Sequence, residues 1–177
     1  MSVVDDVPVV SITPVAEASV TAEVLEDCLS TTLGDVGDKS EGNRESGELL
    51  TSDEVSGGTN LTSLFTAAYA PIGADEDGTP ASPGITTGLS LNTAGLDTLY
   101  SKGQMETYNV VQGATADTLT ASTGNGAVFT LVVNHDGSWS FDLDDQLDHV
   151  DDGTNTENTA LITSADGSTS VSGIDFS

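Results

Sequence analysis

The sequence predicts an all-β protein, an antiparallel β-sandwich of immunoglobulin- or cadherin-like type with long acidic loops and one short helix. Thr (24 residues), Ser (20) and Gly (19) are abundant in the 177-residue chain, and such residues favour strands and turns. Charged residues make up only 18% and are nearly all acidic, whereas the wet faces of helices usually carry Lys, Arg and Glu. Short apolar segments at regular spacing alternate with turns containing Gly and Asp, a pattern typical of sandwiches.

The first elements of the chain are expected to be a strand and a second, ambiguous segment. Residues 3–12 predict a strand in which Pro8 occupies a sheet edge or the strand's first position. Residues 17–29 fit both helical spacing and strict alternation, and we expect a strand followed by a turn there. Cys28 is the only cysteine, which excludes an intrachain disulfide, and we expect it to be a small buried apolar residue.

Two polar loops and a short helix are expected next. Residues 34–58 are rich in Gly and predict a long loop with a short strand at 48–50. Apolar residues over 61–69 recur at i, i+3, i+4, i+7 and i+8, which predicts a short amphipathic helix or a helical turn. Residues 71–84 predict a second loop, bounded by prolines and strongly acidic at its centre.

The second half of the chain predicts a series of strands, with the clearest signal over residues 127–143. This segment reads as a β-hairpin with a turn at 134–137 (Asn-His-Asp-Gly). It contains the only Trp and two of the four Phe, so we expect it to hold a large share of the core. The residues expected on its core face are Phe129, Leu131, Val133, Trp139, Phe141 and Leu143. The strands expected in this half are 85–91, 106–111, 117–121, 127–134, 138–143, 159–164 and 169–176.

The charge of the chain narrows the function classes. Three basic residues against 29 acidic ones give a net charge of −26, which excludes a nucleic-acid binder because phosphates require a basic surface. Electrostatic docking on anionic lipid is excluded for the same reason. Residues 1–6 lack the basic and apolar regions of a signal peptide, and no 18 apolar residues run together, so we expect no direct membrane insertion.

The distribution of the acids predicts calcium binding. Twelve acidic side chains and no Lys or Arg follow Lys102, so we expect solvent cations to neutralise them. Ca²⁺ takes 6–8 oxygen ligands at about 2.3–2.6 Å, and closely spaced loop carboxylates can supply them. Any single Asp here also fits a solvated turn residue, and no segment fits a complete EF-hand loop. The candidate ligands are Asp5, Asp6, Asp75, Asp77, Asp144, Asp145, Asp148 and Asp151.

Other site chemistries find little support in the sequence. His135 and His149 are both flanked by Asp, but two histidines and one distant cysteine do not give a zinc-ligand pattern. No Gly-x-Ser-x-Gly nucleophile motif is present. Paired carboxylates of the kind that hydrolyse glycosides stay open as an alternative, because acids are abundant.

Three segments carry a family resemblance. The stretch GAVFTLVVNHDGSWSFDLDDQLDHV at 126–150, the opening VVDDVPVV at 3–10 and SLFTAAYAPIGADEDG at 63–78 occur in an order that resembles the tandem-repeat domain of giant RTX-type adhesins exported by type I secretion. The resemblance spans most of the chain and is weakest over residues 34–58. In such repeats an Asp-rich turn and a final strand would follow Ser177, so we expect the repeat to be truncated here.

The resemblance implies a structural rather than an enzymatic role. Residues 1–8 would form the junction between repeats and residues 9–177 a single sandwich domain. The domain would be an extracellular or cell-surface spacer, monomeric in isolation, stiffened by Ca²⁺ and adjoined by neighbouring repeats, in a protein that supports adhesion or biofilm formation. Two alternatives stay open: a ligand- or carbohydrate-binding module that uses the loops at 34–58 and 71–84, and a carboxylate-based hydrolase.

Overall fold

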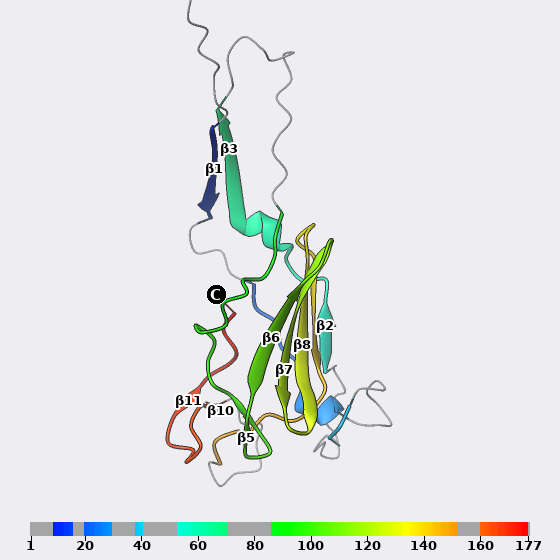
Figure 1. Cartoon of the computed structure of the whole chain (residues 1–177), viewed down its shortest axis with the longest axis vertical. Helices are drawn as coiled ribbons and strands as arrows, with labels where there is room; N and C mark the ends of the chain where they lie inside the picture. Colours follow the sequence, from blue (N-terminus) through cyan, green and yellow to red (C-terminus); the bar gives the residue numbers. More distant parts are fainter. Residues whose placement is uncertain are drawn as a thin grey trace, which may run out of the picture.

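The computed structural model describes residues 9–15, 20–29, 38–40, 53–70, 86–151 and 160–176. These residues form antiparallel strands with almost no helix, which confirms the all-β prediction. The largest sheet has five strands in the order β2-β9-β8-β7-β6, and three two-stranded sheets pair β1 with β3, β4 with β5, and β10 with β11 (Figure 1). The elements are β1 Val9–Pro14, η1 Glu26–Cys28, β2 Glu54–Ser56, η2 Leu61–Leu64, β3 Phe65–Ala70, β4 Tyr100–Ser101, β5 Gln104–Met105, β6 Thr107–Gln112, β7 Ala116–Thr123, β8 Gly126–Asn134, β9 Trp139–Leu143, β10 Leu161–Ile162 and β11 Ser170–Val171.

The core lies on one face of the five-stranded sheet. Side chains of β7, β8 and β9 meet there in rows, because residues opposite one another in antiparallel strands share a face. The rings of Phe129 and Phe141 stack with their centroids 5.2 Å apart at the centre of these rows. The predicted hairpin and its core face are therefore confirmed. The rows are Ala121, Phe129 and Leu143; Leu119, Leu131 and Phe141; and Asp117, Val133 and Trp139.

Irregular segments cover this face in the described part of the chain. Residues 20–29, 86–99 and 161–174 each contribute apolar side chains to the core. Near the C-terminal end the ring of Phe176 packs edge-on against Phe129, with centroids 6.1 Å apart. The core therefore depends on segments that have little regular structure of their own.

A bulge marks the end of the sheet where the acidic segment begins. The pairing of β7 with β8 shifts register next to Ala121, and the adjacent residues Val128 and Phe129 are both fully buried. A bulge bends a strand locally and re-aims its backbone groups. Here the Val128 carbonyl accepts the N–H groups of Asp144 at 2.7 Å and Asp145 at 3.0 Å. The sheet thus fixes where the acidic segment leaves β9.

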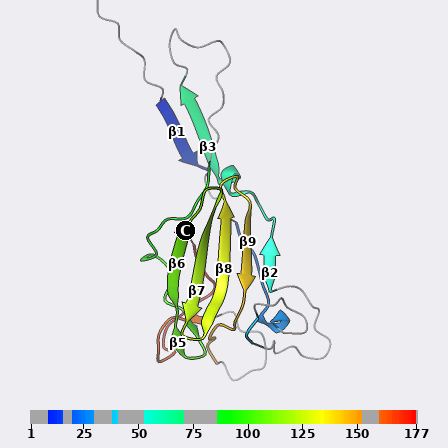
Figure 2. The ribbon, with the colours of Figure 1, turned by 45° about the vertical axis from the view of Figure 1, so that its right-hand side comes forward.

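The ribbon of β1 and β3 extends beyond one end of the five-stranded sheet, as Figures 1 and 2 both show. Its pairing runs from Pro14 opposite Phe65 to Val9 opposite Ala70. Of the helix or helical turn predicted over 61–69, only the first part is confirmed: residues 61–64 form the 3-10 turn η2, and the next six residues form the strand β3 instead. The Asn60 side chain caps that turn by accepting the Thr62 N–H at 2.9 Å. Pairing with β1 then outweighs the helical spacing of the apolar residues.

Several other predicted elements need correction. Residues 86–91 form no strand, and residues 20–25 are irregular before the turn η1. The last two predicted strands shorten to β10 and β11, of two residues each. Cys28 is buried, as expected, and no helix in the described ranges is long and apolar enough to cross a membrane. The predicted strand at 48–50 and the first six residues of the strand at 3–12 lie outside the described residues.

Candidate functional site

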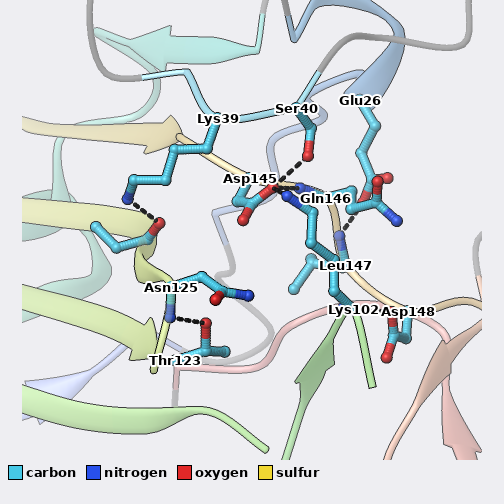
Figure 3. A network of polar contacts seen from close by, with 11 residues as sticks. Glu26, Lys39, Ser40, Lys102, Thr123, Asn125, Asp145, Gln146, Leu147 and Asp148 are labelled. Carbon is cyan, nitrogen blue, oxygen red and sulfur yellow. Dashed lines mark hydrogen bonds and ion pairs between the residues drawn. The ribbon is translucent and has the colours of Figure 1, made fainter. Parts of the chain in front are cut away.

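The acidic segment after β9 is held to the sheet end by a network of polar contacts (Figure 3). At its centre Asp145 is only 1% exposed, and its Oδ1 lies 2.7 Å from Nζ of Lys102. The same oxygen accepts a hydrogen bond from the Ser40 hydroxyl and one from the Gln146 N–H at 3.0 Å. A buried carboxylate is tolerated when it is paired and hydrogen-bonded in this way. Asp145 is thus neutralised by the protein itself.

Asp148 supports the turn between β4 and β5. Lys102 and Gly103 both have positive φ angles, 52° and 73°, as the central residues of a two-residue type I′ turn require. The Asp148 carboxylate accepts the Lys102 N–H at 2.8 Å and the Gly103 N–H at 2.7 Å. Because a non-glycine residue at positive φ is strained, these two hydrogen bonds stabilise the turn.

Glu26 anchors the next part of the segment. Its Oε1 accepts the Leu147 N–H at 2.8 Å and lies 3.0 Å from Nε2 of His149. Glu26 begins the 3-10 turn η1, which is distant from Leu147 in sequence. The acidic segment is therefore connected both to the β4–β5 hairpin and to the segment that covers the core.

The predicted calcium ligands are only partly described. Asp144 donates its N–H to the Val128 carbonyl, and its own carbonyl accepts the Lys39 N–H at 2.8 Å. Asp151 is exposed at the end of a described range. Within the described ranges no three His, Cys, Asp or Glu side chains are grouped to hold a metal ion, and calcium binding stays a prediction. Four of the predicted ligands lie outside the described residues: Asp5, Asp6, Asp75 and Asp77.

Two of the three basic residues have partners within the protein, Lys39 at an exposed site and Lys102 at a buried carboxylate. Nζ of Lys39 donates to the Ala127 carbonyl at 2.6 Å, and Lys102 pairs with Asp145. The expectation that only solvent cations neutralise the acids after Lys102 is therefore wrong at Asp145, because the hairpin turn brings Lys102 itself back to that residue.

Glu106 is a buried acid that the sequence analysis did not single out. Its side chain is 4% exposed, and the polar side chain that acts on its carboxyl group at close range is the Tyr108 hydroxyl. Burial raises the pKa of Glu106 to about 7, the nearby Tyr108 hydroxyl opposes the rise, and the charge of Asp148 adds to it. Alternation along the predicted strand at 106–111 could have found it, since Glu106, Tyr108 and Val110 share one face.

Asp117 and His135 form a second polar cluster at the opposite end of β7. Asp117 accepts the N–H groups of Leu89 at 2.9 Å and Gly113 at 3.2 Å, and its Oδ1 lies 3.3 Å from Nε2 of His135. The Leu89 hydrogen bond is the main cause that lowers the pKa of Asp117. An open depression of about 510 Å³ adjoins this cluster, and its lining within the described part of the chain contains no Phe, Tyr or Trp. The lining residues are Ala114, Thr115, Asn134, His135, Asp136 and Ser138.

Comparisons of the chain with protein-family models, with curated proteins and with solved structures give no match.

Proposed function

We propose that the chain is a structural repeat of a large secreted or surface-bound bacterial adhesin, a Ca²⁺-stiffened spacer of β-sandwich, immunoglobulin- or cadherin-like fold. The observation that carries this proposal is the charge that the fold leaves unbalanced. The net charge is −26, while Lys39 and Lys102 already have partners within the protein. A compact state with this excess repels itself, and cations that bind only the folded form stabilise it.

The shape and the use of acids in turns support a mechanical role. The β1–β3 ribbon continues beyond the end of the sheet, which gives an elongated molecule (Figures 1 and 2). Acids also support tight turns: Asp136 accepts the Ser138 N–H at 2.9 Å, and Ser164 and Ser168 hydroxyls lower the pKa of Asp166 to about 2. The partners we propose are neighbouring repeats of the same polypeptide, outside the cell after type I secretion.

The two alternatives have less support from the described residues. A carbohydrate-binding module usually exposes aromatic rings for stacking, but Trp139 is 7% exposed and the described lining of the open depression near His135 contains no Phe, Tyr or Trp. A hydrolase needs two carboxylates facing a substrate cleft. Asp117 and Asp148 instead accept hydrogen bonds from the backbone of neighbouring segments, and Asp145 accepts one from the adjacent Gln146 N–H and pairs with Lys102.

A scattering experiment on two copies of the chain joined in tandem tests the proposal. A spacer should show a maximum dimension in Ca²⁺ that exceeds that of one copy by close to the length of a second copy. In EGTA the two copies should no longer be held in line. The maximum dimension should then be smaller, and the distribution of interatomic distances should shift to shorter values. Identical curves in Ca²⁺ and EGTA would contradict the proposed function.

A further inference from the structure

The turn between β7 and β8 contains the only Asn-Gly pair in the sequence. Residues 123–126 read Thr-Gly-Asn-Gly, and Thr123 pairs with Gly126 across the turn. The φ angle of Gly126 is 117°, a backbone conformation that residues with a Cβ rarely adopt. The turn therefore favours glycine directly after Asn125.

The side chain of Asn125 is exposed, and within the described part of the chain no hydrogen bond holds its amide group. Only its backbone N–H is fixed locally, by donating to the Thr123 hydroxyl at 3.2 Å (Figure 3). The side chain of Asn92 differs, because its Oδ1 accepts the Ala94 N–H at 3.1 Å. The Asn125 amide can therefore rotate toward the main chain that follows it.

The ammonium group of Lys39 lies against this turn. A Cβ built on Gly126 would lie 2.7 Å from Nζ of Lys39, and Nζ donates to the Ala127 carbonyl at 2.6 Å (Figure 3). The backbone N–H of Lys39 donates to the Asp144 carbonyl at 2.8 Å, which holds the residue beside the sheet. A positive charge at this position stabilises a negative charge that develops on the turn.

We propose that Asn125 is a site of spontaneous deamidation, and that Lys39 accelerates the reaction. The Gly126 backbone nitrogen gives its proton to hydroxide and forms a bond to Cγ of Asn125, and the side-chain nitrogen leaves as ammonia. Water then opens the resulting five-membered imide at either carbonyl, which produces aspartate or isoaspartate at this position. The net change replaces an amide nitrogen with an oxygen from water, so no oxidant or reductant takes part.

The fold places the reacting groups at a favourable location. Asn is among the thermolabile residues, and Gly126 has no side chain to hinder the approach of Cγ to its nitrogen. Exposed turns open locally at a much lower free energy than global unfolding, which frees the Gly126 nitrogen for attack. The product adds a negative charge beside Lys39, and isoaspartate also lengthens the main chain between β7 and β8. The modification does not depend on the proposed function.

Incubation of the full chain for several days at neutral and mildly alkaline pH tests this site. We expect chymotryptic peptides to show, at Asn125, the mass increase that accompanies exchange of NH₂ for OH. A protein isoaspartate methyltransferase should label the same peptide, and both signals should grow with hydroxide concentration. Asn92, which precedes Thr93, is the control within the same chain and should stay unmodified. An intact Asn125 in wild type overturns the proposal.

Variants at Lys39 and Asn125 test the mechanism in proteins whose folding is checked by circular dichroism. Lys39→Met should slow the reaction about fivefold, the effect of one unit charge at close range in water, and Lys39→Arg should keep the wild-type rate. Asn125→Gln should abolish methylation of this peptide, because its longer side chain does not form the five-membered ring. Equal rates in wild type and folded Lys39→Met would overturn the role of Lys39.

Discussion

Nζ of Lys102 lies 2.7 Å from Oδ1 of Asp145, whose side chain is 1% exposed. The same lysine donates its backbone N–H to Asp148. One residue at the tip of the β4–β5 hairpin thus binds two acids of the segment that follows β9. The contact connects two parts of the chain that are far apart in sequence and fixes the acidic segment against the sheet.

Replacing Lys102 should therefore destabilise the protein. In Lys102→Met the buried Asp145 carboxylate loses its counter-charge, and an unsatisfied buried group costs about 1–3 kcal/mol or more. Lys39→Met is the matched control, because Lys39 donates to a carbonyl at an exposed site and leaves no buried charge behind. Urea unfolding in EGTA measures the unfolding free energy of each variant. An equal loss of unfolding free energy in the two variants would show that the ion pair with Asp145 does not stabilise the protein beyond an ordinary surface contact.

Gly58 should not tolerate a side chain. A Cβ at this position would lie 2.6 Å from Cζ2 of Trp139, and overpacking of this kind costs about 1–3 kcal/mol. We expect Gly58→Ala to lower the unfolding free energy and to shift Trp emission to longer wavelength. Gly95→Ala, where a Cβ meets nothing within 4 Å, should leave both unchanged. A neutral Gly58→Ala would mean that Trp139 does not pack against this segment.

Stability without metal should depend on pH through Glu106. The pKa of this carboxyl is raised to about 7 in the folded state from 4.5. Its favourable contribution is therefore complete below about pH 4.5 and is lost as pH rises through about 7, a total change of about 3 kcal/mol. In EGTA, wild type should lose stability relative to Glu106→Gln between about pH 4.5 and pH 7. A difference between the two proteins that stays constant over this range would contradict the burial of an ionisable Glu106.

The double variant Asp144→Asn with Asp148→Asn tests the acidic segment as a calcium site. If these acids contribute ligands, the variant should lose a large part of the stabilisation that Ca²⁺ gives. It should also be less stable than wild type in EGTA by about 1 kcal/mol, because Asp148 supports the β4–β5 turn. Thermal unfolding in both buffers separates the two effects, and a full calcium response in the variant would exclude the segment as a ligand source.

Local alternation predicted the central part of the fold. Strands β6 to β9 and the turn at residues 134–137 follow from apolar residues repeating every second position and from Gly137, whose φ is 89°. These signals lie within a few residues of one another. The core face of the β8–β9 hairpin could be predicted because its rows of apolar residues form between adjacent strands.

Long-range pairing explains what the sequence did not predict. The spacing from Leu61 to Tyr69 fits a helix, yet β3 pairs with β1 from far away in sequence. The acidic residues at 142–152 fit both a cation site and a solvated loop. Their actual positions depend on long-range contacts such as Lys102 with Asp145 and Glu26 with Leu147. Glu106 was missed because acidic residues are rarely buried, although alternation along residues 106–111 places it on the same face as Tyr108 and Val110.

The most direct test of the central claim is the melting temperature of the full chain in Ca²⁺ and in EGTA at equal ionic strength, with Mg²⁺ as a control for nonspecific screening. A ligand at about one hundred times its Kd adds about 2.7 kcal/mol, and each kcal/mol raises the melting temperature of a domain of this size by about 2–4 °C. We expect a rise of about 5–10 °C in Ca²⁺ and a smaller rise in Mg²⁺. Superimposable melting curves in Ca²⁺ and EGTA would contradict it.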